Sequence, residues 1–171
     1  HLSLRRQRQM CIRDSDERPT NSFLYSLVMD TYSFGYSSSG FTDMPMNHKV
    51  FLAQFDAIKK LASEGPCVMV GRCADYALSE YKDCFSVFVH ADTDWRINRL
   101  SQKHNKTAKE AKDMINKTDK SRSSYYNYYT NKKWGAASSY NLCVDSSKLG
   151  IDGAAKAIIQ AIEIFDSIKN K

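Results

Sequence analysis

Apolar runs and apolar stripes divide the chain into predicted strands and helices. Residues 67–70 form an apolar run without polar alternation, which predicts a strand buried on both faces. Residues 84–91 and 141–144 repeat this pattern and predict two further strands. Helical spacing and cap residues predict a helix from Thr20 or Asn21 to Phe34 and a second from Asn47 to the Gly65-Pro66 pair. A short helix is predicted over residues 74–81, and another after Asp92. Two long helices are predicted, one from the Thr107–Glu110 capping box onward and one over residues 151–168.

The order of these elements predicts the fold class. From residue 67 onward it is β-α-β-α-α-β-α, which predicts an α/β protein with a parallel sheet and crossover helices on both faces, in three layers. A chain of 171 residues suffices for one domain with its own core. We therefore expect a single domain over residues 16–171.

Composition narrows the class of protein. The hydrophobic fraction of 42% and the charged fraction of 26% are typical of a soluble globular protein, and no apolar run approaches the ~20 residues of a membrane span. The cysteines lack the paired spacing of a zinc site, and Cys67, Cys84 and Cys143 lie in apolar runs. We interpret them as buried core residues of a cytoplasmic protein, and we predict neither a disulfide framework nor a metal site.

The first fifteen residues differ from the rest. They carry half of the net charge of +6, start without methionine and resemble a translated adapter sequence. We expect residues 1–15 to be a non-native or disordered extension, the alternative being a basic arm that binds nucleic acid. Further on, Gly35 and Gly40 have the spacing of a phosphate-binding loop, but Phe41 stands where the lysine should be, so we discount this match.

Candidate chemistry first occurs at the end of the 67–70 run. Gly71 permits close approach of the backbone to a ligand, and Arg72 can place two parallel hydrogen bonds on a phosphate. Asp75, about one helical turn later, could hold a base, a sugar or Arg72 itself. A plain ion pair at the end of a strand explains the same residues equally well.

A second candidate is the basic, tyrosine-rich segment at residues 117–133. Its cations are spaced for one surface and suit a transferring phosphoryl group, whose charge must be neutralised. The same cations beside four tyrosines could instead bind single-stranded nucleic acid. They could also be the solvated face of a long helix. The cations are Lys117, Lys120, Arg122 and Lys133.

Three motifs together resemble the cytidylate kinase-like proteins, members of the P-loop nucleoside monophosphate kinase group. They are residues 67–75, residues 117–129 and residues 145–151, and the likeness covers about residues 16–165. The resemblance implies phosphoryl transfer from ATP to a nucleoside monophosphate, with Mg²⁺. We expect no membrane partner and no stable nucleic-acid partner.

The resemblance also implies roles for individual residues. Arg72 after Gly71 would meet the acceptor phosphate, and Asp75 belongs to the same substrate-binding stretch. A helical lid is expected over about residues 105–135, with catalytic cations that close over the phosphates and an acid that helps to hold the acceptor. These lid residues are Lys117, Lys120, Arg122 and Asp119. The substrate-binding arginines on the helix before the lid are Arg96 and Arg99. The strand-end turn beside the nucleotide base is Asp145, Ser146 and Ser147.

The chain departs from the family pattern in two places. Cytidylate kinases have aspartate directly after the Gly-Arg pair, whereas here Cys73 and Ala74 precede Asp75. The expected acceptor is CMP or dCMP, but this departure weakens the sequence support for a cytosine base. No Gly-x-x-x-x-Gly-Lys-Ser/Thr occurs in the sequence. We therefore expect a P-loop kinase fold that lacks its first β-α unit and is weak or inactive alone, because the ATP phosphates lack their amide cradle. The alternative is a non-catalytic protein that binds nucleotide or RNA.

Overall fold

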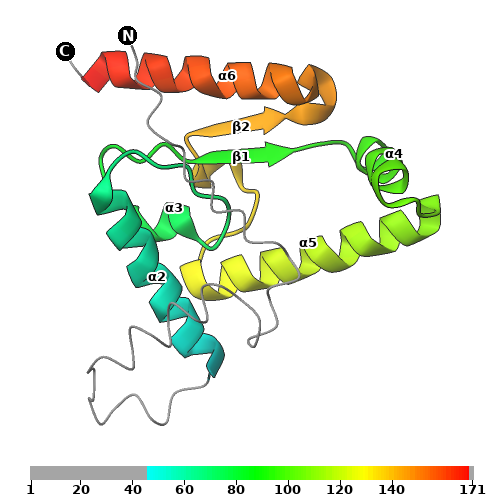
Figure 1. Cartoon of the computed structure of the whole chain (residues 1–171), viewed down its shortest axis with the longest axis horizontal. Coiled ribbons are helices and arrows are strands. Elements are labelled where there is room, and N and C mark those ends of the chain that lie inside the picture. Colours follow the sequence, from blue (N-terminus) through cyan, green and yellow to red (C-terminus); the bar gives the residue numbers. More distant parts are fainter. Residues whose placement is uncertain (1–45, 170–171) are drawn as a thin grey trace. The chain divides into compact units, whose positions relative to one another are not determined.

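The computed structural model describes residues 46–169 (Figure 1). The chain divides into two compact units, residues 1–81 and residues 82–171, and each is described by itself. The helix predicted over residues 20–34, the discounted glycine loop and the segment 1–15 lie outside the described residues.

In the first unit, helix α2 (Met46–Glu64) confirms the helix predicted from Asn47. Its apolar stripe packs inward: Phe51 is 8% exposed and Ile58 4% exposed. The ring of Phe55 lies 6.1 Å from that of Tyr76 in the short helix α3 (Ala74–Ala77), so the two helices contact each other. Helix α2 ends at Glu64, directly before the Gly65-Pro66 pair, as expected of residues that cannot continue a helix.

The buried strand predicted at residues 67–70 is wrong. The segment is extended without forming a strand, with one isolated bridge at Met69, and Val68 and Val70 are 59% and 62% exposed. An apolar run is buried only where neighbouring elements cover it, and the exposure of Val68 and Val70 shows that this run is not covered. The prediction that Cys67, Cys84 and Cys143 are buried core residues is also wrong. Cys67 is exposed, and Cys84 and Cys143 are half-buried, whereas Cys73 is buried.

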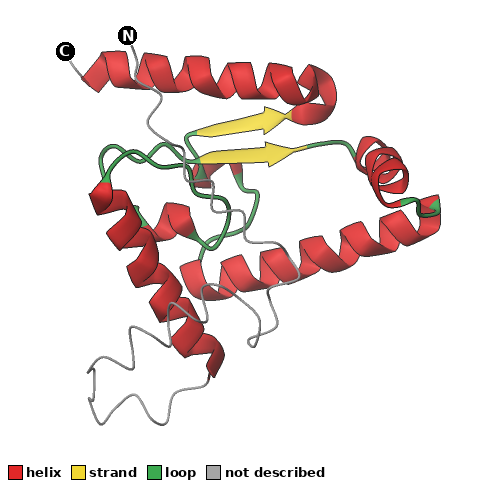
Figure 2. Ribbon diagram, in the orientation of Figure 1, coloured by secondary structure: helices red, strands yellow, loops and turns green. Residues whose placement is uncertain are grey.

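The second unit is built on a parallel pair of strands, β1 (Val87–His90) and β2 (Leu142–Asp145) (Figure 2). Val87 lies opposite Leu142 and His90 opposite Asp145, so both strands end at one edge. Within residues 46–169 the sheet has these two strands. This confirms a mixed helix and strand structure with a small parallel sheet, as an α/β class requires, whereas the three-layer P-loop kinase arrangement stays a prediction.

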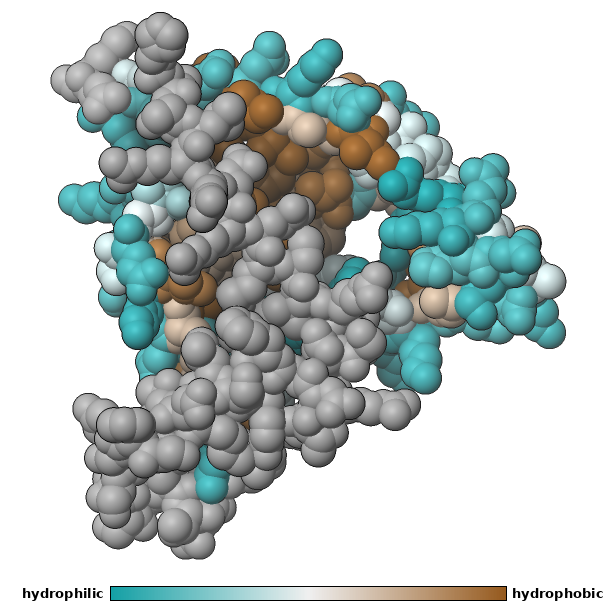
Figure 3. All heavy atoms as spheres, in the orientation of Figure 1, coloured by the Kyte–Doolittle hydropathy of each residue, from teal (hydrophilic) through white to brown (hydrophobic). Residues whose placement is uncertain are grey.

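Helix α6 (Ser146–Lys169) packs along the sheet (Figure 1). Its regular course is interrupted at Gly150, where φ is 68°, so the long final helix starts at residue 151 as predicted. Val144 of β2 is 4% exposed, but Val89, opposite it in β1, is 53% exposed. The expectation that residues 84–91 form a fully buried strand is therefore wrong. Apolar side chains gather at the visible surface around α6 and the sheet (Figure 3).

Aromatic side chains pack around Phe88 of β1. The rings of Trp134 and Tyr140 lie 5.4 Å and 5.0 Å from it. Gly135, with φ of 75°, approaches so closely that an added Cβ would lie 3.1 Å from the Phe88 ring. This close approach requires glycine, because a side chain would meet the ring and strain the backbone. The short 3₁₀ helix η2 (Ala137–Ser139) lies in the sequence between Trp134 and Tyr140 of this cluster and precedes β2.

Two consecutive helices, α4 (Thr93–His104) and α5 (Ala108–Thr130), pack on each other and are called the α4–α5 arm here. The predicted capping box is confirmed at the start of α5: the Glu110 backbone N–H donates to Thr107 Oγ1 at 3.3 Å, and the Thr107 N–H donates to Glu110 Oε2 at 2.8 Å. Asp92 occupies the N-cap position of α4, but its side chain makes no capping bond. Among the described helices, none is long and apolar enough to cross a membrane.

Candidate functional site

Arg72 lies in an unusual turn. Gly71, Arg72 and Cys73 have φ values of 72°, 56° and 55°, so three consecutive residues adopt left-handed backbone. The turn is closed by a hydrogen bond from the Ala74 N–H to the Gly71 carbonyl at 3.1 Å, and it leads directly into α3. Left-handed geometry at two residues other than glycine costs about 1–3 kcal/mol each, and such strain is typical of functional sites.

The Arg72 side chain is half-buried, and within the described residues it forms no ion pair or hydrogen bond. The predicted alternative, an ion pair with Asp75, does not form in the structure. The neighbouring Cys73 thiol has its pKa raised to about 12, chiefly by burial and further by Asp75. A partly desolvated guanidinium without a carboxylate partner is suited to an external anion such as a phosphate.

Arg96 and Asp119 bind each other across the α4–α5 arm. Arg96 Nη1 donates to Asp119 Oδ2 at 2.7 Å, and Nη2 donates to Oδ1 at 2.8 Å, which is the bidentate fork. Their side chains are 30% and 27% exposed. The hydrogen bonds from the guanidinium to the carboxylate raise the pKa of Arg96. The two residues were predicted to contact substrate, and the structure brings them together as a pair.

The predicted cations of α5 do not share one face. The helix is continuous through them, and at about 100° per residue Lys117 and Lys120 lie about 60° apart, whereas Arg122 lies about 140–160° from both. The single cationic surface predicted from the spacing is therefore wrong. Arg122 lies on the face that carries Ile115, Asp119 and Tyr126, and Ile115 and Tyr126 are 4% and 5% exposed, yet Arg122 itself is exposed. Of these three cations, Arg122 is the one on the inner face of the arm.

Arg99 of α4 is exposed, and its guanidinium carbon lies 5.4 Å from the centre of the Trp95 ring. This distance fits a cation–π contact, which orders the side chain along the helix surface. This contact does not test the predicted substrate-binding role of Arg99, which stays a prediction.

The turn after β2 is held by its own side chains. Ser147 donates to Asp145 Oδ1 from its backbone nitrogen at 2.8 Å and from Oγ at 2.5 Å. These bonds, that from the hydroxyl most of all, lower the pKa of Asp145. Ser146 Oγ donates to the His90 carbonyl at 3.0 Å, which joins the ends of the two strands. The residues predicted to lie beside a nucleotide base are thus brought together, with hydroxyl protons already bonded within the protein.

Two residues that sequence reasoning missed complete this turn. The Asp92 N–H donates to Ser147 Oγ at 3.2 Å, and the Asp92 carboxylate pairs with Lys148 at 3.1 Å. This pairing raises the pKa of Lys148. Lys148 directly follows Ser147 and Asp92 directly follows a predicted strand, so their placement at one sheet edge was a signal that could have found them. The turn is therefore connected to the start of α4.

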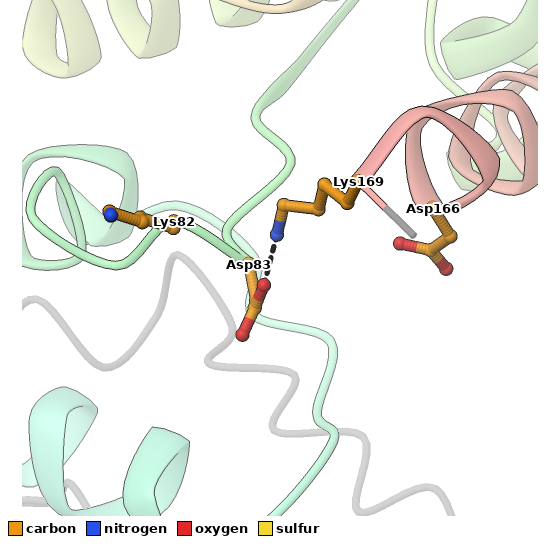
Figure 4. A pocket seen from close by; sticks show the side chains of 4 residues that line it. All are labelled: Lys82, Asp83, Asp166 and Lys169. Atoms are coloured by element: carbon orange, nitrogen blue, oxygen red, sulfur yellow. Dashed lines mark hydrogen bonds and ion pairs between the residues drawn. The ribbon is translucent and has the colours of Figure 1, made fainter. Parts of the chain in front are cut away.

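A shallow surface pocket lies elsewhere in the second unit (Figure 4). It is lined by four charged residues, Lys82, Asp83, Asp166 and Lys169, and Lys169 pairs with Asp83. None of the predicted site residues lines it. Within the part of the chain that the structure describes, no group of three or more His, Cys, Asp or Glu side chains could hold a metal ion.

The comparisons with known proteins decide the family. The model of the cytidylate kinase-like family matches residues 5–148. The chain belongs to the cytidylate kinase-like family. The match contains the Arg72 turn, the whole α4–α5 arm and the Asp145–Ser147 turn, and it also includes residues 5–15, which the sequence suggested to be foreign. Membership confirms the resemblance and indicates nucleotide kinase-like function, for which ATP and Mg²⁺ are the general cofactors.

A solved structure supports the shared fold. The chain is 30% identical to an uncharacterized protein from Eubacterium ventriosum ATCC 27560 whose crystal structure is known, with a TM-score of 0.68. The likeness covers 81% of this cytidylate kinase-like chain and 80% of the other. No curated protein matches the chain.

Proposed function

We propose that this cytidylate kinase-like protein binds a nucleoside monophosphate, CMP or dCMP, as acceptor for phosphoryl transfer from ATP. The observation that carries the proposal is Arg72, a half-buried arginine that forms no ion pair within the described residues and is held in a left-handed turn after Gly71. Its fork matches the oxygens of a phosphate, and Asp75 stands in the first turn of the adjoining α3. The family membership supports a nucleotide phosphate as this anion.

The α4–α5 arm supplies the lid in this proposal. Arg122 on the inner face of α5 would neutralise charge on the transferring phosphoryl group. Lys117 and Lys120 would attract the nucleotide from the outer face, and Arg99 is available on α4. Asp145, Ser146 and Ser147 would border the base of the donor nucleotide at the carboxyl edge of the sheet.

The residues present fit ATP only in part. The serines of the Asp145–Ser147 turn bond within the protein, and the sequence has no P-loop motif to cradle the phosphates. When bound, Mg²⁺–ATP would supply the phosphoryl group and neutralise its charge. We therefore propose that this chain binds its acceptor but transfers phosphate only weakly by itself.

The test is calorimetric titration of the chain with CMP, dCMP, UMP and AMP, followed by single-turnover assays with ATP and Mg²⁺ at stoichiometric enzyme. We expect CMP and dCMP to bind more tightly than AMP. Arg122→Ala should lower the transfer rate while leaving CMP affinity nearly unchanged, because its charge serves the transition state. Lys112→Ala, an exposed cation of the same helix, is the control. Binding of none of the four nucleotides would overturn the proposal.

A second function is favoured by one observation, the cluster of tyrosines near the end of α5. The ring of Tyr129 lies 4.8 Å from that of Tyr125 and 4.9 Å from that of Tyr128, and Tyr128 is 76% exposed. Clustered aromatic rings, one of them largely exposed, followed by Lys132 and Lys133 suit single-stranded nucleic acid. Salt-dependent binding of single-stranded RNA, lost in Tyr128→Ala, without binding of any nucleoside monophosphate would favour this function over the kinase.

A further inference from the structure

The resemblance implies that Arg96 and Asp119 bind substrate, but in the structure they bind each other. We propose that Arg96 and Asp119 are positioning residues that clamp α4 to α5 and set the orientation of Arg122, and that neither side chain contacts the nucleotide. This inference rests on the proposed function, because it assigns roles within the proposed lid.

The first support is the use of the carboxylate. Both oxygens of Asp119 accept hydrogen bonds from Arg96, at 2.7 Å and 2.8 Å, and both terminal nitrogens of Arg96 donate to it. The partners lie 23 residues apart in sequence, so the pair joins two helices and stabilises their packing. Its side chains are each about one third exposed or less. An acceptor sugar would have to compete with a charge-assisted bidentate pair that is shielded from much of the solvent.

The second support is the position of Arg122. It follows Asp119 by three residues, which places the two side chains about 60° apart around the axis of α5 and one turn apart along it. Rotation of α5 about its axis would carry both together. Because Asp119 is fixed to α4, the direction in which Arg122 projects is fixed as well. Ile115, buried one turn before Asp119, anchors the same face.

The experiment is a double-mutant cycle on the full chain. It compares Arg96→Ala, Asp119→Ala, their combination and the exchanged pair Arg96→Asp with Asp119→Arg. Asp113→Ala, an exposed carboxylate of α5, is the matched control. Each variant is measured for urea unfolding, for CMP affinity by calorimetry and for single-turnover transfer from ATP.

We expect each single variant to lower the urea midpoint, the double variant to lower it little further, and the exchanged pair to recover part of the loss. CMP affinity should stay within about threefold of the wild type in all of them, because no contact to CMP is lost. Transfer should fall as in Arg122→Ala and recover in the exchanged pair. The control should match the wild type in all three measurements.

A role as ligand gives a different result. Loss of a charged hydrogen bond to the acceptor would weaken CMP binding about 10- to 150-fold in Asp119→Ala, and the exchanged pair would not restore it. That outcome, or additive losses of the urea midpoint in the cycle, would overturn the inference. Neither measurement requires turnover. If the wild type binds no nucleotide, the proposed function fails. The urea midpoints of the single and double variants still decide whether the pair joins the two helices, because they show whether the two losses of stability are additive.

Discussion

Two half-buried arginines of this chain stand in opposite electrostatic environments. Arg96 forms a bidentate pair with Asp119 on regular helices, whereas Arg72 has no ion pair within the described residues and sits in a turn with left-handed backbone. Pairing of a charge inside the protein stabilises a packing arrangement. A charge kept without a partner, on a strained backbone, costs stability and is expected where a ligand supplies the missing partner. The contrast separates an arginine that joins two helices from one for which we propose an anionic ligand.

The largest expected effect is at Arg96. Arg96→Ala leaves the half-buried Asp119 carboxylate without its donors, so the free energy of unfolding should fall by about 1–2 kcal/mol, between the values typical of exposed and buried pairs. Urea unfolding followed by circular dichroism measures this. An unchanged midpoint would mean that the pair does not hold the arm together.

The second prediction concerns the Thr107–Glu110 capping box, at the turn between α4 and α5. Thr107→Ala removes the acceptor for the Glu110 N–H and should lower the free energy of unfolding by about 1 kcal/mol. It should also let the pKa of Glu110 rise part of the way toward its usual value, because the bond from the Thr107 hydroxyl is lost while the bond from the Thr107 backbone N–H, the larger cause of the lowered pKa, remains. Stability from this carboxylate is present above its unfolded pKa and is lost on acidification, so the variant should show a weaker loss below about pH 4.5. Urea unfolding at pH 7 and pH 3.5 separates the two effects.

Arg72 should respond with the opposite sign. Arg72→Gly removes the side chain that disfavours a φ of 56°, so we expect a gain of about 0.5–1 kcal/mol after the greater chain entropy of unfolded glycine is subtracted. Unfolding of this variant should occur at higher urea. A loss of stability would show that Arg72 contributes to the fold as Arg96 does, and the comparison would then fail.

The smallest effect is chemical and concerns the thiol beside Arg72. Because burial raises the pKa of Cys73 to about 12, it should resist iodoacetamide at pH 8, while the exposed Cys67 should react. The raised pKa also predicts that the stability associated with Cys73 is complete below about pH 9 and is lost as the pH rises toward 12. Mass spectrometry of the alkylated, digested protein identifies the modified residue. Modification of Cys73 at the rate of Cys67 would contradict the burial.

Local signals in the sequence predicted much of this structure. The capping box needs only two residues three positions apart, and the helices from Asn47, Asp92, Thr107 and residue 151 follow from their apolar spacing. The parallel pairing of β1 and β2 followed from the helices between them. These features depend on neighbours in the chain, which a sequence displays directly.

Features that depend on distant neighbours were not predictable. The 67–70 run and β2 have similar composition, but Val144 is buried where α6 packs on β2, whereas Val68 and Val70 are exposed. Nothing in the sequence indicates that Arg96 selects Asp119 among the acids of α5. The left-handed backbone at Arg72 and Cys73 could not be predicted either, because glycine is the residue that usually indicates this conformation in a sequence. The acceptor, lid and nucleotide-base roles stay predictions.

The most direct test of the account is calorimetric titration of CMP into the wild-type chain, Arg72→Ala and Lys60→Ala. Lys60 is an exposed cation of the same unit, so it controls for the loss of one charge. We predict that the wild type and Lys60→Ala bind CMP alike, and that Arg72→Ala binds at least about tenfold more weakly, because a charged hydrogen bond to the phosphate is lost. Equal affinity of Arg72→Ala and the wild type would contradict the assignment of Arg72 to the acceptor phosphate.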